Sequence, residues 1–294
     1  MNIEHPLFQA LSGPVARLWL NARRAGSSPA PGSLRILHFH ETPRDAHPLF
    51  SRLVKRLREE HGIVGPDDAE ALLEGRGAPR SVGRAPCLLT FDDGFKSNYF
   101  LAREVLEPLG VRAVFFVCPG LVDLDPALQR EAIAGNIRQD ISLLDKAELE
   151  QELMTWKEIR ELAAAGHVVG SHSLSHRRLS EANPAELENE IGKAAALLET
   201  RLGRAPRWIA FPFGNISSIN YAALALVAKH HRFCRSGVRG LNIPGTPLLG
   251  LFSEVLDLRT PLDYQLAAAG GALDFRYRDA RRELAVKLAA YKVS

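Results

Sequence analysis

Short apolar runs alternate with helical patterns along most of the chain. Continuous apolar runs, as expected for strands buried on both faces, occur at residues 34–40, 87–91, 111–117, 167–172 and 208–214. Helices are predicted between and after them, where apolar residues recur every three or four positions, at residues 49–61, 97–109, 155–165, 184–202 and 221–229. This alternation favours parallel β-α-β units in a single α/β fold.

Local signals mark where some of these elements begin and end. Thr155 and Glu158 have the spacing of a capping box, and Gly166 follows the helix that they open. The next strand therefore delivers His172 at its carboxyl end, where parallel α/β folds collect their catalytic residues. Beyond Lys229 the pattern weakens and predicts no clear element.

The amino-terminal part of the chain differs from the rest. Residues 25–33 are rich in Gly, Ser and Pro, so residues 1–33 are interpreted as a leader helix and linker before a domain at residues 34–294. Residues 6–20 have an amphipathic pattern that suits either a helix packed on the domain or a helix at a membrane surface. Gly13 and Pro14 interrupt a regular face, which favours packing.

Composition limits the class of protein. The chain has 294 residues, of which 46% are hydrophobic and 24% charged, enough for one large buried core. The net charge is +3, and basic runs interleaved with aromatics are absent, so a nucleic-acid partner is not expected. Three widely spaced cysteines do not suggest a disulfide framework. With no apolar run long enough for a membrane span and no evident signal peptide, a cytoplasmic location is expected.

Two polar motifs carry the candidate chemistry. T-F-D-D-G occupies residues 90–94, and H-S-L-S-H occupies residues 172–176. Asp93, His172 and His176 together offer one carboxylate oxygen and two imidazole nitrogens, the open three-ligand set of a catalytic divalent metal ion. At a strand end that turns into a loop led by Gly94, Asp92 can reach the same cavity and handle protons.

The paired motifs resemble those of the polysaccharide deacetylases, the carbohydrate esterase family 4 enzymes, over about residues 35–240. The resemblance implies a single distorted (β/α) barrel of about seven parallel strands. It also implies that Asp92 is the catalytic base and that Asp93, His172 and His176 bind the metal ion. This ion is expected to be zinc, with cobalt, nickel or iron as alternatives, because the ligand set suits each of them.

A third motif departs from the family pattern. Residues 210–214, A-F-P-F-G, resemble the family's R-x-P-[FY]-G, but Ala210 stands where the family has an arginine that orients the catalytic aspartate. The resemblance implies that the backbone N–H of Phe213, within the Pro212–Gly214 turn, faces the developing oxyanion.

The family's general-acid histidine, expected near the carboxyl terminus, is missing, because no histidine follows His231. The strand at residues 35–41 resembles the early strand of the circularly permuted poly-N-acetylglucosamine deacetylases, which bears the acid. His40 is therefore the candidate acid. The side chain of His38 points to the same side of this strand as that of His40 but lies deeper in the barrel, and we interpret His38 as a packing residue.

The sequence thus predicts hydrolysis of the N-acetyl group of an amino sugar in a polysaccharide, oligosaccharide or glycan precursor, with release of acetate. Two alternatives stay open. One is a catalytically inactive binding or scaffold module, favoured by Ala210. The other is an amidohydrolase that acts on a small non-sugar amide or formamide. For a sugar site, aromatic side chains beside a groove are expected, and Phe95, Tyr99, Trp156 and Phe213 are available.

Overall fold

The computed structural model describes residues 29–77, 84–144 and 152–289. The predicted leader helix at residues 6–20 and the first part of the linker lie outside this range. Every helix in the described segments is too short or too polar to cross a bilayer.

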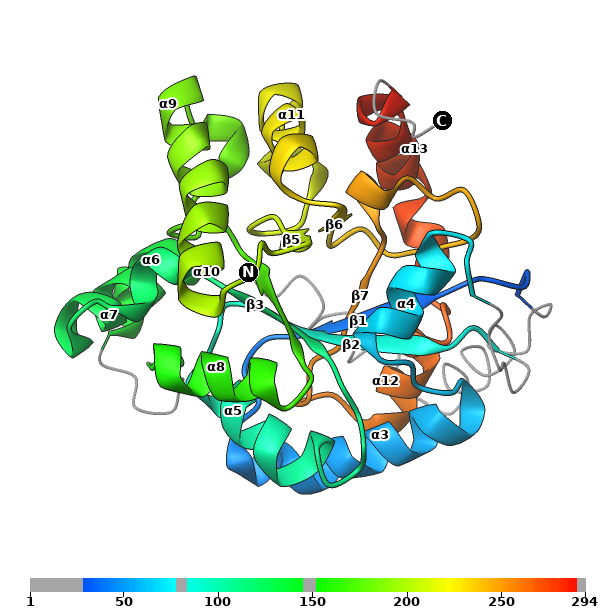
Figure 1. The fold of residues 1–294 in the computed structure, drawn as a ribbon. Helices are drawn as coiled ribbons and strands as arrows, with labels where there is room; N and C mark the ends of the chain where they lie inside the picture. The colour runs from blue at the N-terminus through cyan, green and yellow to red at the C-terminus, as the bar shows by residue number, and fades with distance from the viewer. Residues whose placement is uncertain (1–28, 78–83, 145–151, 290–294) are drawn as a thin grey trace.

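Seven parallel strands form one sheet in the order β6-β5-β4-β3-β2-β1-β7 (Figure 1). The strands are β1 (Arg35–Phe39), β2 (Cys87–Phe91), β3 (Val114–Val117), β4 (Val168–Ser171), β5 (Trp208–Ala210), β6 (Phe233–Arg235) and β7 (Glu254–Val255). Each of the six pairings is parallel, and β1 pairs with β2 in register from Arg35 opposite Cys87 to Phe39 opposite Phe91. The fold that the sequence predicts, a distorted barrel of about seven parallel strands, is confirmed.

The sheet curls until one extended segment touches both of its edges. Leu251 forms a parallel bridge with Arg235 at the end of β6, and three residues later the chain enters β7, which pairs with β1. Asn242 holds this segment by hydrogen bonds to the backbone of Leu34 and Phe252. The two edge strands therefore approach each other across a short stretch of chain, as in a barrel that is nearly closed.

Helices surround the strands (Figure 1). They are α3 (His47–Glu60), α4 (Pro66–Leu73), α5 (Lys96–Leu101), α6 (Pro119–Val122), α7 (Pro126–Ala132), α8 (Trp156–Ala164), α9 (Pro184–Leu187), α10 (Ala194–Leu202), α11 (Tyr221–His230), α12 (Leu262–Ala269) and α13 (Arg278–Lys287). A π-helical stretch joins α9 to α10, so the two make up the helix predicted at residues 184–202. The capping box of Thr155 and Glu158 at the start of α8 is present as predicted.

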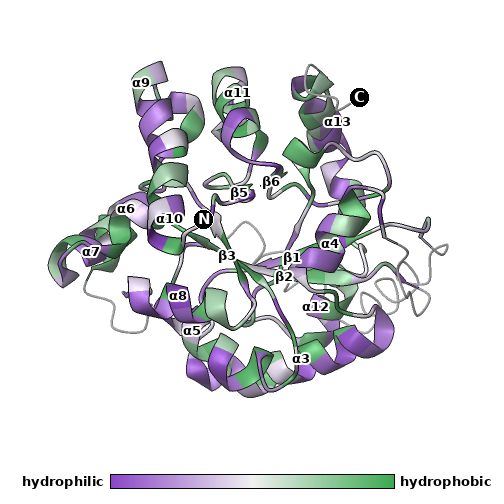
Figure 2. Cartoon of the chain, in the orientation of Figure 1, coloured by the Kyte–Doolittle hydropathy of each residue, from purple (hydrophilic) through white to green (hydrophobic). Residues whose placement is uncertain are grey.

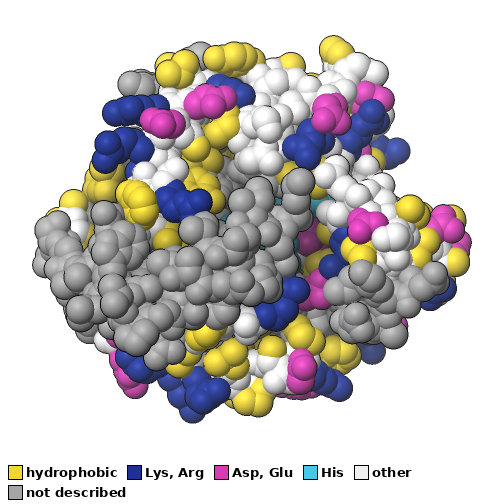
Figure 3. Space-filling model, turned by 180° about the vertical axis from the view of Figure 1, so that it is seen from behind, with side chains coloured by type: hydrophobic (Ala, Val, Ile, Leu, Met, Phe, Trp, Pro, Cys, Tyr) yellow, Lys and Arg dark blue, Asp and Glu magenta, His cyan; other side chains and the backbone are white. Residues whose placement is uncertain are grey.

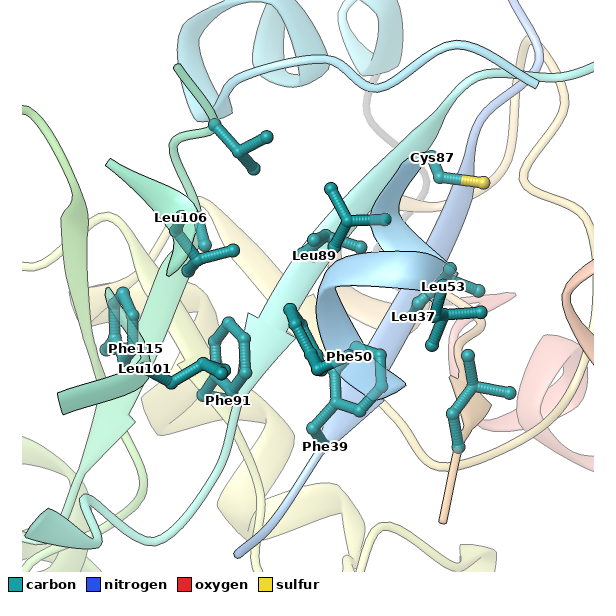
Figure 4. Close-up of a cluster of buried hydrophobic side chains, with 14 of the residues drawn as sticks. Leu37, Phe39, Phe50, Leu53, Cys87, Leu89, Phe91, Leu101, Leu106 and Phe115 are labelled. Atoms are coloured by element: carbon teal, nitrogen blue, oxygen red, sulfur yellow. The ribbon is translucent and has the colours of Figure 1, made fainter. Parts of the chain in front are cut away.

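The outer face of the sheet packs against the surrounding helices. Phe39, Phe91 and Phe115 form a row across β1, β2 and β3, with stacked rings 5.4 Å and 4.8 Å apart (Figure 4). Phe50 of α3 and Leu101 of α5 cover this row. The helices accordingly carry apolar residues on one side and polar residues on the other (Figure 2).

The inner face changes character along the strands. At their amino-terminal ends it is apolar, with Ile36, Leu88, Trp208 and Phe233 packed against Leu72 of α4, which closes that end of the barrel. Farther along, the inward positions become polar, and His38, Thr90 and Arg235 are all buried. Because parallel strands end on the same rim, these polar positions gather at the carboxyl end of the sheet.

Candidate active site

Three predicted metal ligands meet just beyond the ends of β2 and β4. The Nε2 atoms of His172 and His176 each lie 3.3 Å from the same oxygen, Oδ1 of Asp93. All three side chains are buried, and their ligand atoms lie within 4.8 Å of one another. The sequence motifs, which are separated by about eighty residues, are therefore brought together as predicted.

Backbone carbonyl groups orient both imidazole rings. Nδ1 of His172 lies 2.7 Å from the carbonyl oxygen of Ala210, and Nδ1 of His176 lies 3.1 Å from that of Asn136. Since a carbonyl oxygen only accepts hydrogen bonds, each Nδ1 carries a proton, and Nε2 is the ring nitrogen that faces Asp93. Metal-binding histidines are commonly held in this way, so the donor set fits a divalent cation.

The loops that carry the ligands hold unusual backbone conformations. Asp93, Ser173, His176 and Phe213 have φ values of 70°, 64°, 63° and 64°, in the left-handed region that non-glycine residues rarely adopt. Four of the five such residues in the described segments lie at this site. Strained backbone concentrates at functional sites, where the surrounding structure enforces it. His176 thus reaches His172 from a loop, with no helical turn between them.

The charges of the three groups are coupled. Burial alone raises the pKa of the Asp93 carboxyl, but hydrogen bonds from His172 and His176 outweigh it and hold that pKa well below its usual range. Burial opposes protonation of His172, yet its hydrogen bond to Asp93 raises its pKa above the ordinary value. The carboxylate is therefore kept ionised beside two nitrogens, which suits a site for positive charge.

Asp92 faces a second group of polar side chains. A ligand-type atom of Asp92 lies within 4.8 Å of nitrogens of His38 and His40, and of the three residues only His40 is exposed. The structure thus brings His40 to the catalytic aspartate predicted from the sequence. The rings of His38 and His40 meet edge to face with centroids 5.6 Å apart.

His38 does more than fill space beneath His40. Its Nδ1 lies 3.0 Å from Oγ of Ser253, and that hydroxyl donates its single proton to the carbonyl oxygen of Ser236 at 2.5 Å. Nδ1 of His38 must therefore be the donor, which leaves Nε2 as an acceptor. Burial first, and then the nearby charge of Arg235, hold the pKa of His38 well below its usual range. His38 is accordingly a neutral, hydrogen-bonded member of the polar layer, and the interpretation as a packing residue was incomplete.

Arg235 is a site residue that the sequence reasoning missed. Its Nη2 donates to Oδ2 of Asp92 at 2.5 Å, and both side chains are buried. The signal in the sequence was an arginine at the end of the short apolar pair Phe233–Cys234, where an inward-facing charge is unusual. Its partner in the fold lies 143 positions away in the chain, so no local pattern pointed to it.

The turn Pro212–Gly214 lies beside the three ligands. The ring of Phe213 packs edge to face on that of His176, with centroids 4.7 Å apart, and the guanidinium group of Arg178 lies 4.4 Å from the Phe213 ring centroid. Gly214 has a φ of 65°, and a Cβ there would lie 2.7 Å from the backbone nitrogen of Gly237. The turn is therefore tightly packed and allows only glycine at position 214.

Three of the four aromatic side chains that are available for a sugar site pack in the hydrophobic core. Phe95 and Trp156 are 1% and 5% exposed and belong to hydrophobic clusters. Tyr99 packs against the core, and its hydroxyl donates to Glu161 of α8. Tyr99 and Phe213 are partly exposed, and of the four only Phe213 packs on a predicted ligand, His176. From the face shown in Figure 3, histidine side chains are visible in a hollow bordered by acidic side chains.

The sequence is similar to that of known deacetylases. The family model described as polysaccharide deacetylase matches residues 80–230, just over half of the chain. A peptidoglycan-N-acetylglucosamine deacetylase of Bacillus cereus is 38% identical over 58 residues, which are 20% of this chain and 21% of the relative. A chitooligosaccharide deacetylase of Bradyrhizobium is 29% identical over 136 residues, 45% of this chain and 48% of the relative. The chain thus spans less than half the length of these curated relatives.

Solved structures share the fold. The Streptococcus pyogenes deacetylase PplD, solved with acetate, superposes with a TM-score of 0.62 at 20% identity, over 82% of this chain and 99% of that one. IcaB from Ammonifex degensii gives a TM-score of 0.63 at 23% identity, over 83% and 99% of the two chains. The matched family range contains Asp92, Asp93 and both histidine ligands, whereas His40 and Arg235 lie outside it.

Proposed function

Because the chain belongs to the polysaccharide deacetylase family, we propose that it is a metal-dependent hydrolase that removes the N-acetyl group from an amino sugar in a saccharide or glycan precursor. One observation carries the proposal: two imidazole Nε2 atoms converge on one oxygen of Asp93, beside a separate aspartate and an exposed histidine. This arrangement separates the binding of a cation from the transfer of protons.

Asp93, His172 and His176 are the residues that would hold the metal ion. Their donor set of one oxygen and two nitrogens suits zinc and also cobalt, nickel or iron, and it leaves positions open for a substrate and water. When bound, such an ion polarises an amide carbonyl and makes a water molecule more acidic.

The remaining groups supply the proton transfers. Asp92 takes a proton from the attacking water, whose oxygen joins the carbonyl carbon of the acetamide. The backbone N–H of Phe213 stabilises the negative charge that develops on the carbonyl oxygen. His40, exposed at the rim, gives a proton to the sugar nitrogen as the carbon–nitrogen bond breaks. The products are acetate and a free amino sugar.

The substrate class rests on the relatives. The two curated relatives are named for peptidoglycan N-acetylglucosamine and chitooligosaccharide, so an N-acetylglucosamine unit is the first choice for this chain. The partly exposed Phe213 ring beside the ligands offers one apolar surface for a sugar. The cytoplasmic location expected from the sequence, and with it a glycan precursor as substrate, stays a prediction.

The test is acetate release from a substrate panel. Metal-loaded protein is incubated with N-acetylglucosamine oligosaccharides, an N-acetylated sugar nucleotide, and N-methylformamide as a small non-sugar amide. Acetate from at least one saccharide, its loss after chelation and its loss in Asp92→Asn at unchanged metal content are expected. Release of formate from N-methylformamide, with no acetate from any saccharide, would favour the amidohydrolase. No hydrolysis of any compound by metal-loaded protein would favour an inactive module.

A further inference from the structure

The guanidinium group of Arg235 binds the predicted catalytic base directly. Nη2 donates to Oδ2 of Asp92 at 2.5 Å, and the side chains are only 2% and 4% exposed. A hydrogen bond between two ionised and buried groups is among the stronger polar contacts in a protein. Since both groups are desolvated, neither is free to turn toward water when the other is lost.

Two further contacts hold Arg235 itself. Nη1 donates to Oγ of Ser253 at 3.1 Å, in the segment that closes the barrel. The hydroxyl of Ser253 donates onward to the carbonyl oxygen of Ser236, so it is held as an acceptor for Arg235. The guanidinium carbon lies 5.2 Å from the ring centroid of Phe116 on β3, within cation–π range. The fork that reaches Asp92 is therefore rigid.

The register of the sheet explains why this arginine can serve Asp92. Ala210 on β5 and Arg235 on β6 are direct partners in a parallel pairing. In-register residues of adjacent parallel strands face the same side of a sheet, about 4.8 Å apart. Ala210, where the family motif has its arginine, therefore has a neighbour on the next strand that reaches the same carboxylate.

The two carboxylate oxygens of Asp92 therefore differ in their hydrogen bonding. Oδ2 accepts from Arg235, while Oδ1 is buried and has no hydrogen-bond partner among the described residues. A buried acceptor without a partner is uncommon and points to a group that acts on a ligand or water.

We propose that Arg235 is a positioning residue, which holds Oδ2 of Asp92 from β6 in place of the arginine missing at position 210 and so directs Oδ1 at the water to be deprotonated. This inference rests on the proposed deacetylase function. It also counts against the reading of Ala210 as a sign of an inactive module, because the support of the base has moved by one strand and has not been lost.

A double-mutant cycle tests whether Arg235 acts through Asp92. Acetate release and metal content are measured for wild type, Arg235→Ala, Asp92→Asn and the double variant. The Arg235→Ala variant should keep its metal ion and an unchanged KM, and its kcat should fall by roughly 10- to 100-fold. In the Asp92→Asn background, the further substitution Arg235→Ala should change kcat by less than about 2-fold. Arg207→Ala, which removes a half-exposed arginine bound to Glu70 at the opposite end of the barrel, is the matched control. Equal losses in both backgrounds, or no loss in Arg235→Ala, would overturn the inference.

Two further measurements cover other outcomes. If Arg235→Ala does not fold, Arg235→Lys keeps the charge but cannot donate to Asp92 and Ser253 in the same geometry, so it should lose at least about 10-fold in kcat. Wild-type turnover in Arg235→Lys would overturn the inference. Crystal structures of the wild type and the folded variant should show the Asp92 carboxylate turned in the variant, and an unmoved carboxylate would also overturn it. The carboxylate could be turned in the variant while the wild-type protein releases no acetate. That result would support the positioning role of Arg235 and reject the proposed function.

Discussion

At the scale of single residues, Asp92 and Asp93 are neighbours in the chain that face different partners. Asp93 has a φ of 70°, which turns its carboxylate to His172 and His176. Asp92 continues the inward alternation of β2 and meets Arg235. Metal binding and proton transfer are therefore assigned to adjacent side chains, and substitutions should separate them.

Asp93→Ala should remove most of the bound metal, because the two remaining imidazoles make an incomplete site. Metal content per protein is measured by elemental analysis after dialysis. Asp68→Ala, an exposed position on α4 at the far end of the barrel, is the control and should keep its metal. Full metal occupancy in Asp93→Ala would remove this residue from the ligand set.

His40→Ala should slow hydrolysis of an acetamide far more than hydrolysis of an activated acetate ester, whose leaving group needs no proton. A selective loss on the order of 100-fold on the amide, with metal retained, is the expected result. Both rates are measured on the same preparation. Similar losses on both substrates would return the role of general acid to another residue.

At the scale of elements, the sequence indicated the strands that carry its motifs and missed the two short strands near the carboxyl end of the barrel domain, β6 and β7. Strands β1 to β5 are apolar runs flanked by turn residues, and each was predicted within a few positions. Strands β6 and β7 are short and contain Arg235 and Glu254, which are buried in ion pairs with Asp92 and Arg239. Helices α4, α6, α7, α12 and α13 were missed as well.

The loops between elements were the least predictable part of the site. Ser173, His176 and Phe213 have left-handed backbone conformations that no residue preference signals. The carbonyl oxygen of Asn136 that orients His176 comes from the π-helical stretch Ile133–Ile137, which follows α7. That Asp93, His172 and His176 come together could thus be predicted, but the means by which they are held could not.

The capping box of α8 was predicted and is present, so its removal has an expected cost. Thr155→Ala deletes the acceptor for the backbone N–H of Glu158 and should lower the free energy of unfolding by about 1 kcal/mol. Urea denaturation measures the change, and metal content should stay the same because the ligands are untouched. Thr200→Ala, an exposed threonine in α10, should cost less than about 0.5 kcal/mol. An equal cost for the two variants would show that the cap adds nothing.

At the scale of the whole molecule, the curled sheet divides the barrel into an apolar end closed by α4 and a polar rim. Histidines His61, His167 and His231 lie away from the rim, and burial first of all lowers the pKa of each from 6.5 to about 4. Between pH 6.5 and about pH 4 these histidines are therefore mostly neutral in the folded protein and mostly charged in the unfolded chain.

These histidines should make the protein less stable in mild acid. The free energy of unfolding is unaffected by these histidines above their unfolded pKa of 6.5. It decreases as the pH falls from 6.5 toward 4, because in this range the histidines bind protons in the unfolded chain and not in the folded protein. Each of the three histidines should lower the free energy of unfolding by about 2 kcal/mol when the pH reaches 5. His231→Asn can still donate to the carbonyl of Pro206, and its loss of stability between pH 7 and pH 5 in urea denaturation should be smaller by about that amount. The same loss in the variant and the wild type would contradict this account.

The most direct measurement is the rate of acetate release from an N-acetylglucosamine oligosaccharide as metal-free protein is titrated with zinc. We predict a rate that rises in proportion to bound metal and levels off at about one equivalent, because Asp93, His172 and His176 form a single site beside Asp92. A rate that is the same without metal, or no acetate release at full occupancy, would contradict the assignment of this chain as a metal-dependent deacetylase.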